Sequence, residues 1–447
     1  MRALSPFFAL LFSTALLVAG QGLQGALVPL RGEAEGFGSF WVGGFGSSFY
    51  LGFAIGCVAA PALVARAGHI RVFAALVGLK SGTIILHPLA IDPAVWTVLR
   101  MVTGFCLAGL YIIIESWLNE RTDNSNRGLV MSIYVIINFA MLTFGQMLLI
   151  TYPLESFALF TLASVLVSFA ALPLALSRAT QPAPLYVVRL NLRRLVSNSP
   201  VGVVATFGVG AATAAFWALG GVYASRSGLT TDQAALFLSV AVVGAAFSQW
   251  PVGRLSDKID RRLVLVGLHV ASCLAGLAVF LVQPSSLIPI LLGGFAIGAT
   301  VFPAYAVAVA HTYDHADPDE YVTMASGLML VFAIGSILGP ISASVLVDAM
   351  GPQGFFAFIG LVEGTLAVFV IGRLAFSTPV EEGEKEDFSL ATTAPVGLVL
   401  SDGDLQDQDV DLVELQPVVF EGGEEDAENA LEGDDDAPRQ ERADPSP

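Results

Sequence analysis

The sequence predicts an all-α integral membrane protein with about twelve transmembrane helices. Hydrophobic residues make up 55% of the 447 residues and charged residues only 13%, with a mean hydropathy of +0.73. Water-soluble proteins carry about 25% charged residues, so that class is excluded. Apolar windows of about 20 residues, the length that crosses a bilayer, lie near 7–29, 41–61, 72–91, 95–118, 128–150, 154–177, 200–223, 233–253, 263–282, 286–310, 322–347 and 353–376.

Charge is distributed unevenly along the chain. Residues 377–447 hold 22 of the 38 acidic residues and 3 of the 21 basic residues, a net charge of −19. The remaining 18 basic and 16 acidic residues leave the body of the protein almost neutral, which argues against a nucleic-acid partner. The acidic segment repels itself and has little apolar surface to bury, so we expect a disordered tail.

Basic residues in the connections between spans indicate the orientation. Thirteen Lys and Arg residues lie at the N-terminus and in the even-numbered connections, against Arg31 and Arg226 in the odd-numbered ones. Cytoplasmic connections carry the excess of basic residues. We therefore expect a multi-pass protein of the cell (inner) membrane with both termini in the cytoplasm. The apolar N-terminus could pass for a cleaved signal peptide, but the repeat described next requires it as the first span.

The chain repeats itself weakly. Ser5-Pro6 before the first span returns as Ser199-Pro200 before the seventh, and PALVARAGHIR (61–71) lies about 192 residues before GRLSDKIDRRL (253–263). Two six-helix halves in parallel repeat are typical of one large class of transporters. We predict an N-terminal half at 1–177, a basic cytoplasmic linker at 178–199, a C-terminal half at 200–376 and the tail at 377–447. The linker either lies along anionic lipid headgroups or is a plain tether.

The charged decapeptide GRLSDKIDRR (253–262) connects two apolar spans. Its glycine permits close helix approach, its first aspartate lies one helical turn before an arginine, and its basic pair can anchor the next helix at the headgroups. The decapeptide resembles the loop signature of the major facilitator superfamily. That resemblance implies a gating loop formed by Gly253, Asp257, Lys258, Arg261 and Arg262. The first-half copy has alanine where the aspartate is expected.

Further motifs extend this resemblance over residues 5–376. Arg100-Met-Val-Thr-Gly104 is similar to the superfamily's arginine and glycine in the fourth span, whereas the glycine–proline motif of the fifth span is absent. The strings IIIESWLNERTDNSNRG (112–128), FPAYAVAVAHTYDH (302–315) and YVTMASGLMLVFAIGSILGP (321–340) look like the YcaD-like branch. The branch implies a bacterial inner-membrane carrier and no particular substrate.

Ionisable groups within spans are costly and are therefore candidates for function. Arg100, Tyr111 and Glu115 share one face of the fourth span, which we expect to line a central cavity beside Gly104. Glu115 and Glu363 are the candidate proton-coupling residues. Glu115 could instead pair with a loop arginine, and Glu363 could face the back of the bundle. The predicted substrate-binding residues are Arg100, Lys80, Gln21, Gln24, Tyr111, Asn138, Trp217 and Tyr305.

Signs of other chemistry are weak. His311, Asp314, His315 and Asp317 suggest a metal site, but they lack a fixed ligand spacing and we interpret them as a solvated turn. The three cysteines lie singly in apolar runs, without the spacing of a metal or redox site. No catalytic triad or nucleotide-binding glycine loop is present. We therefore expect no enzymatic activity, no cofactor and no metal.

These observations together predict a monomeric secondary transporter in the lipid bilayer. It would move a small organic solute, anionic or zwitterionic because the candidate cavity contains Lys80 and Arg100, by alternating access and with proton coupling. A membrane sensor that signals through its acidic tail is one alternative. A lipid flippase on the same fold is another.

Overall fold

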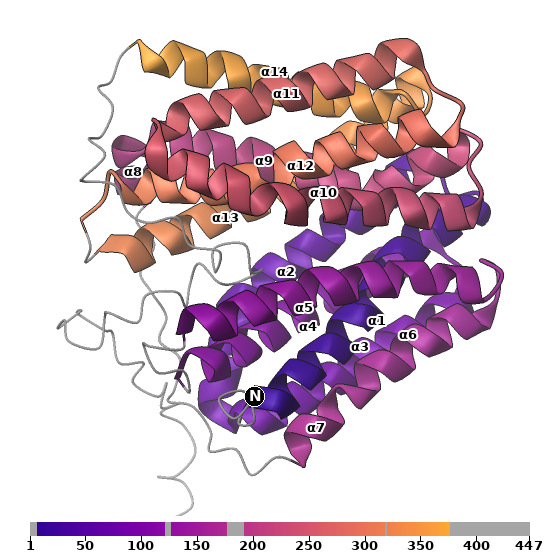
Figure 1. Cartoon of the computed structure of the whole chain (residues 1–447). Coiled ribbons are helices and arrows are strands. Elements are labelled where there is room, and N and C mark those ends of the chain that lie inside the picture. The colour runs from indigo at the N-terminus through magenta and orange to yellow at the C-terminus, as the bar shows by residue number, and fades with distance from the viewer. Residues whose placement is uncertain (1–6, 121–126, 177–191, 318–319, 376–447) are drawn as a thin grey trace, which may run out of the picture. The chain divides into compact units, whose positions relative to one another are not determined.

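The computed structural model describes residues 7–120, 127–176, 192–317 and 320–375, and these residues form a bundle of helices (Figure 1). The first half contains α1 (Phe8–Ala34), α2 (Ser39–Ala67), α3 (His69–Leu89), α4 (Pro93–Glu120), α5 (Arg127–Met147), the short 3-10 helix η2 (Leu148–Thr151), α6 (Phe157–Phe169) and α7 (Ala171–Ala175). The second half contains α9 (Pro200–Arg226), α10 (Thr231–Lys258), α11 (Arg261–Val282), α12 (Leu287–Tyr313), α13 (Tyr321–Met350) and α14 (Gly354–Leu374), preceded by the short α8 (Leu192–Asn198).

The predicted number of spans is confirmed. Among the described residues, 12 helical segments are long and apolar enough to cross a membrane, and α6 and α7 together supply the sixth. Their limits differ from the predicted windows by a few residues, because the helices continue past the apolar core into the connections. The predicted acidic tail and residues 178–191 of the predicted linker lie outside the described residues.

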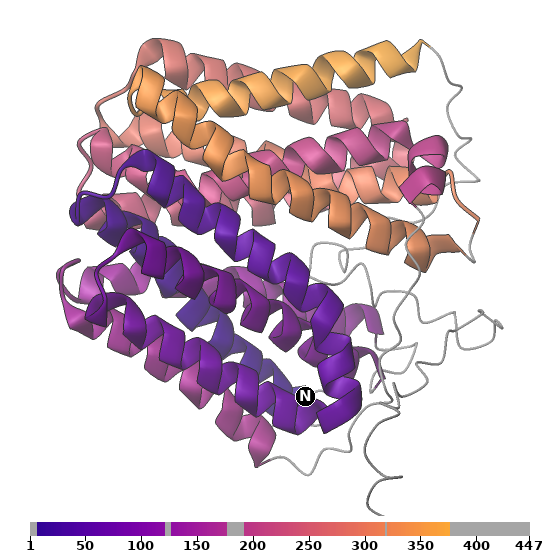
Figure 2. The ribbon, with the colours of Figure 1, turned by 180° about the vertical axis from the view of Figure 1, so that it is seen from behind.

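The two halves use the same packing pattern, as their sequence repeat predicts. In the first half α2 packs along α4, α1 along α5 and α3 along α6; in the second, α10 packs along α12, α9 along α13 and α11 along α14. Figures 1 and 2 show the indigo-to-magenta helices of the first half and the magenta-to-yellow helices of the second as two groups. The residue limits assigned to the halves remain predictions.

Glycines allow equivalent helix pairs to cross closely. A Cβ atom at Gly104 of α4 would lie 1.9 Å from the carbonyl oxygen of Phe49 in α2. In the second half, a Cβ atom at Gly298 of α12 would lie 2.0 Å from the carbonyl oxygen of Ala241 in α10. Without a strong hydrophobic drive between helices in lipid, small residues permit the close packing that joins them. Gly104 is therefore a packing residue against α2. It does not provide cavity space beside Arg100, contrary to the expectation from their shared helical face.

The connections define two faces of the bundle. The face at which α1 begins also carries the connections between α2 and α3 and between α10 and α11, with exposed Arg66, Arg71 and Lys258; we call it the basic face. The connections between α1 and α2, α3 and α4, α9 and α10, and α13 and α14 lie at the other end, which we call the opposite face. The orientation expected from the sequence would place the basic face in the cytoplasm.

Candidate functional site

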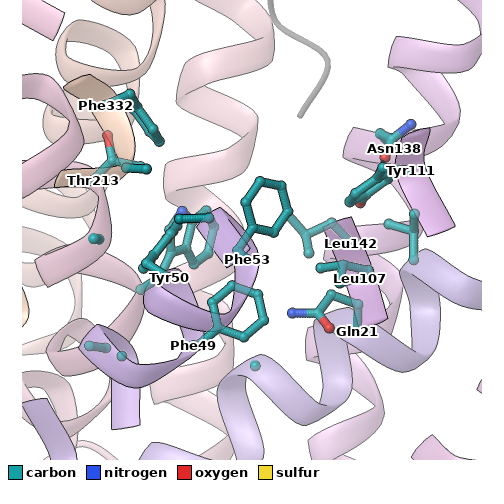
Figure 3. Close-up of a pocket in the computed structure, with 18 of the residues that line it drawn as sticks. Gln21, Phe49, Tyr50, Phe53, Leu107, Tyr111, Asn138, Leu142, Thr213 and Phe332 are labelled. Atoms are coloured by element: carbon teal, nitrogen blue, oxygen red, sulfur yellow. Dashed lines mark hydrogen bonds between the residues drawn. The ribbon is translucent and has the colours of Figure 1, made fainter. Parts of the chain in front are cut away.

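A cavity of about 510 Å³ lies between the two halves. Its lining residues come from α1, α2, α4 and α5 of the first half and from α9, α10, α12 and α13 of the second. None of the described lining residues belongs to α3, α6, α11 or α14. The volume is within the range of small-molecule sites. Figure 3 shows part of its lining, with Thr213 and Phe332 of the second half on one side and Gln21, Tyr111 and Asn138 of the first half on the other.

Six of the eight predicted substrate-binding residues line this cavity, and two lie behind it. The six are Arg100, Gln21, Tyr111, Asn138, Trp217 and Tyr305. The remaining two, Lys80 and Gln24, are fully buried behind the wall that α1 forms. The sequence places residues on helical faces but does not specify how each helix is turned within the bundle. The substrate-binding role of all eight remains a prediction.

Arg100 is a buried cation on the first-half wall. Its side chain is 6% exposed, and its guanidinium carbon lies 4.6 Å from the centroid of the Phe49 ring. Nε and Nη1 have no hydrogen-bond partner among the described residues. The face of the Phe49 ring stabilises the guanidinium cation, but it supplies no hydrogen-bond acceptor to Nε and Nη1. Arg100 can therefore accept a ligand that supplies oxygen atoms.

Lys80 contacts two amides of α1 instead of the cavity. Its Nζ donates to Oε1 of Gln21 at 2.6 Å and to Oε1 of Gln24 at 3.3 Å. The Gln24 amide nitrogen in turn donates to Thr103 Oγ1 at 3.4 Å, which joins α1, α3 and α4. Lys80 therefore lies one layer behind the cavity wall, with Gln21 in front of it.

Three hydrogen bonds link the cavity-lining Tyr111 and Asn138 to Tyr134 and the Tyr134 side chain to Glu115. The Tyr111 hydroxyl donates to Asn138 Oδ1 at 3.3 Å, and Asn138 Nδ2 donates to the Tyr134 carbonyl at 2.9 Å. The Tyr134 hydroxyl donates to Glu115 Oε1 at 2.8 Å. Glu115 is fully buried and does not line the cavity, unlike Arg100 and Tyr111 of the same helix. The side chains of its predicted alternative partners, Arg121 and Arg127, lie outside the described side chains.

Aromatic side chains dominate the second-half wall. Trp217 and Phe302 stack with centroids 5.5 Å apart and planes at 19°, and Tyr305 packs edge-on to Phe332.

Residue-by-residue reasoning missed several lining residues of both halves: Phe49, Tyr50, Phe53, Thr213, Phe302 and Phe332. Tyr50 carried a usable signal, because a tyrosine between two phenylalanines deep in an apolar span needs a polar neighbour. The phenylalanines carried none, because lipid-facing and cavity-facing aromatics look alike in a sequence.

Glu363 is paired within the second half. Its Oε2 lies 2.7 Å from Nδ1 of His269, and both side chains are 0% exposed. The pair joins α11 to α14, two helices that do not line the cavity. The sequence indicated the buried carboxylate but not its partner, because 94 residues separate the two positions.

The decapeptide holds the second half together at the basic face. Nη2 of Arg261 lies 3.7 Å from Asp257, which confirms the predicted one-turn pair, and Nε of Arg261 lies 2.9 Å from Asp314 at the end of α12. The expectation that Arg261 and Arg262 anchor the helix at the headgroups is wrong. Both are buried in protein, because acidic groups of the same half hold them there.

Asp260 begins α11. It accepts a hydrogen bond from the backbone N–H of Arg262 at 2.9 Å and pairs with the side chain of the same residue at 2.6 Å. Partial burial opposes ionisation, but the hydrogen bonds from Arg262 hold the pKa of Asp260 below its ordinary value.

The predicted solvated turn near residue 311 is instead partly buried. His311 is buried against His315, and the Asp314 side chain is almost inaccessible because it is paired with Arg261. Only Asp317 of the four predicted residues is exposed. His311, Asp314 and His315 therefore contribute to helix packing at the basic face.

The halves contact each other at the opposite face. Arg226 of α9 makes a two-point ion pair with Glu33 of α1, at 2.6 and 2.7 Å, and donates to Ser39 Oγ of α2 at 2.8 Å. Nearby, a Cβ atom on Gly43 of α2 would lie 2.6 Å from the carbonyl oxygen of Pro340 in α13. The cavity lining, by contrast, reaches toward the basic face at Pro61 of α2. The opposite end of the cavity is therefore closed by direct contact between the halves.

Comparisons with known proteins agree with this architecture. The sequence profile of the Major Facilitator Superfamily matches residues 10–316 and 202–405. The uncharacterized MFS-type transporter YcaD of Escherichia fergusonii is 27% identical over 362 residues, which cover 80% of this chain and 93% of that protein. The protein of the same name from Salmonella arizonae is 26% identical over 378 residues, covering 84% and 97%.

Solved structures show the same fold at lower identity. The nucleoside transporter NupG superimposes with a TM-score of 0.68 at 14% identity, covering 83% of this chain and 100% of that one. A bacterial homologue of the human lysosomal transporter Spinster gives a TM-score of 0.66 at 16% identity, covering 83% and 95%. The twelve spans, the repeated packing and the profile match lead to one assignment: the chain belongs to the major facilitator superfamily and is a membrane transporter of YcaD-like type.

Proposed function

We propose that this transporter is a secondary carrier that moves a small organic solute across the cytoplasmic membrane by alternating access of its two halves. The observation that carries the proposal is the cavity between the halves, to which each half contributes four helices. Direct contacts between the halves close it at the opposite face, where Arg226 pairs with Glu33. Separating these contacts while closing the basic face would present the same site to the other side of the membrane.

In this proposal the decapeptide is the gating element of the second half. Asp257, Arg261 and Asp314 join the end of α10, the start of α11 and the end of α12. Such a charge cluster holds three helix ends as one unit while that half rotates. Gly253 and Lys258 complete the predicted gating loop within the last turns of α10.

We further propose that proton movement drives the carrier through Glu363 and Glu115. Two buried carboxylates, each hydrogen-bonded to a titratable side chain, support the proposal: Glu363 to His269 and Glu115 to Tyr134. A buried carboxylate with one proton-exchanging neighbour can change its charge when its surroundings change. Neither carboxylate lines the solute cavity, so the proton and the solute would occupy separate sites.

Native Cys57 provides a test of alternating access that does not require a known solute. Cys57 lines the cavity on α2, whereas the other cysteines, Cys106 and Cys273, do not. In oriented proteoliposomes of the Cys106→Ser, Cys273→Ser variant, we expect a charged, impermeant thiol reagent to label Cys57 from the basic face. Cross-linking the opposite face through Glu33→Cys and Arg226→Cys, in that background with Cys57 protected until the cross-link has formed, should preserve labelling from the basic face and abolish labelling from the opposite face. Labelling from the opposite face that persists in the cross-linked protein would refute the proposal.

The proton proposal is tested with a solute obtained from a thermal-shift screen of metabolites and drugs. Uptake into proteoliposomes is measured with and without an imposed pH gradient. We expect the gradient to accelerate wild-type transport and to have no effect on Glu363→Gln, which still binds the solute. Glu155→Gln, at an exposed position outside the cavity, is the matched control. Equal wild-type rates with and without the gradient would eliminate proton coupling.

A further inference from the structure

The buried ammonium of Lys80 determines how the amide of Gln21 is turned. An ammonium group has hydrogen atoms to donate and no lone pair to accept with. Its contacts at 2.6 Å with Gln21 and 3.3 Å with Gln24 must therefore be to the amide oxygens. The NH₂ group of Gln21 is then left for the cavity. In Figure 3 the Gln21 nitrogen is directed toward Phe49, the ring that also contacts the Arg100 guanidinium.

The first-half wall consequently offers hydrogen-bond donors. Gln21 presents its NH₂ group, and Arg100 lines the cavity with a guanidinium group whose buried Nε and Nη1 have no partner among the described residues. Other polar residues of this wall are already hydrogen-bonded, since the Tyr111 hydroxyl donates to Asn138, Asn138 donates to the Tyr134 carbonyl and Gln146 Oε1 accepts from Ser239. A group that lies beside Gln21 and Arg100 must supply acceptors.

The charged residues around the cavity also favour a ligand that supplies acceptors. Arg100 lines it and Lys80 lies directly behind Gln21, while no aspartate or glutamate is among the described lining residues. Two positive charges buried in the membrane region without a carboxylate partner are costly. A bound anion would compensate them and would receive charge-assisted hydrogen bonds.

The second-half wall favours an apolar body. Trp217 stacks on Phe302, and Tyr305 and Phe332 continue the aromatic surface. A molecule that spans the cavity would therefore present an acidic group to the first half and an apolar or aromatic group to the second. This arrangement also suits a carrier, because one solute would contact both moving halves.

We propose that the transported solute is an organic carboxylate with an apolar or aromatic body, whose carboxylate binds Arg100 and the NH₂ group of Gln21. Lys80 is a positioning residue that keeps the Gln21 amide turned toward this carboxylate. The proposal rests on the proposed function, since it names the substrate class of the same cavity. The solute's acidic group contacts the first half and its body contacts Trp217 and Phe302 of the second.

The test uses the purified full-length protein and three probes of one shape: 4-phenylbutyrate, 4-phenylbutanamide and 4-phenylbutylamine. Affinity is measured from the quenching of tryptophan fluorescence and checked by thermal shift. We expect the acid to bind at least about tenfold more tightly than the amide, as the loss of charge-assisted hydrogen bonds predicts, and the amine to bind most weakly.

Variants separate the two parts of the proposal. Arg100→Gln and Gln21→Glu should each weaken the acid about tenfold or more and leave the amide nearly unchanged, whereas Arg193→Gln, an exposed arginine of α8, should change neither. Lys80→Met should lower the preference for acid over amide, because Gln21 can then turn its oxygen into the cavity. Lys80→Arg, which again offers only donors, should restore that preference.

Several outcomes would overturn the inference. Equal binding of the three probes, tightest binding of the amine, or no binding of any probe would reject an organic carboxylate. An equal loss of all three probes in Lys80→Met would show a structural role only and would reject the positioning of Gln21. None of these outcomes depends on alternating access, which the labelling of Cys57 tests separately. Labelling of Cys57 from both faces of the cross-linked protein, with selective binding of the acid, would reject the carrier and retain the binding site.

Discussion

The ion pair between Arg226 and Glu33 stabilises the conformation in which the opposite face is closed. It joins α9 of one half to α1 of the other through two hydrogen bonds of 2.6 and 2.7 Å. Replacing either residue with glutamine removes the charge attraction and keeps a polar side chain of similar length. We expect each replacement to shift the protein toward the conformation in which the opposite face is open.

The size of the shift follows from the geometry. The two side chains are 27% and 23% exposed, so water screens the pair and it resembles a favourable surface ion pair more than a buried one. The two-point geometry places its coupling free energy near the upper end of that class, about 1 kcal/mol. One kcal/mol corresponds to about a fivefold change in the ratio of the closed to the open population.

Pulsed electron spin resonance between labels at Ile91→Cys and Met350→Cys measures that ratio. Both positions are exposed at the opposite face, one in each half. Arg226→Gln and Glu33→Gln should each lower the ratio about fivefold, and the double variant should lower it little further, because the pair is already lost. The native cysteines are replaced in all samples.

Glu35→Gln is the matched control for Glu33→Gln. Glu35 lies two residues further along the chain, also at the opposite face, but it pairs with Arg31 inside the first half and does not join the halves. Glu35→Gln should leave the ratio of closed to open populations unchanged. If Glu33→Gln behaves like Glu35→Gln, or if the two single effects add fully in the double variant, the pair does not control closure.

Three further predictions concern stability in detergent. Gly104→Ala should unfold well below the wild-type temperature, at a cost of about 1–3 kcal/mol, because its Cβ would meet the α2 backbone, whereas Gly78→Ala has open space and should be neutral. Asp314→Asn should lower stability because it removes the carboxylate 2.9 Å from the buried Arg261, but by less than the roughly 3–5 kcal/mol of a fully broken buried pair, since Asp257 remains 3.7 Å away; the exposed Asp317→Asn should cost little. The pKa of Asp260 is lowered from 3.8 in the folded state, so its ionised form adds stability that is complete above about pH 4 and is lost as the pH falls through the folded pKa. In urea unfolding, the higher stability of the wild type over Asp260→Asn should therefore disappear in that acidic range. A constant difference in stability from pH 7 to pH 3 would contradict this prediction.

The spans and their number were predictable because the bilayer imposes one requirement on every crossing helix. About 20 apolar residues must follow one another, and that pattern is visible without knowing what packs against what. The repeat was visible for a similar reason, since two copies of one six-helix unit retain a few residues at equal spacing. Arg261 and Asp257 could be paired in advance because they lie one turn apart on adjoining helix ends.

The positions of single side chains around the cavity were less predictable. Arg100 and Lys80 look alike in the sequence, each a lone cation in an apolar span, yet only Arg100 reaches the cavity. The difference is the rotation of α3 and α4 about their axes, which depends on contacts with helices far away in the sequence. Glu363 shows the same limit, because its partner His269 comes from another helix. Lipid-facing and cavity-facing phenylalanines likewise differ only in what surrounds them.

The contact of Lys80 with α1 also bears on how the chain enters the membrane during synthesis. A lysine at the centre of a helix raises the free energy of insertion by about 2.5–3.5 kcal/mol. Because α1 leaves the ribosome before α3, the amide oxygens of Gln21 and Gln24 are already in the bilayer when that lysine arrives. The first helix can thus assist the biogenesis of the third, and a nascent chain that lacked both glutamines would integrate α3 less efficiently.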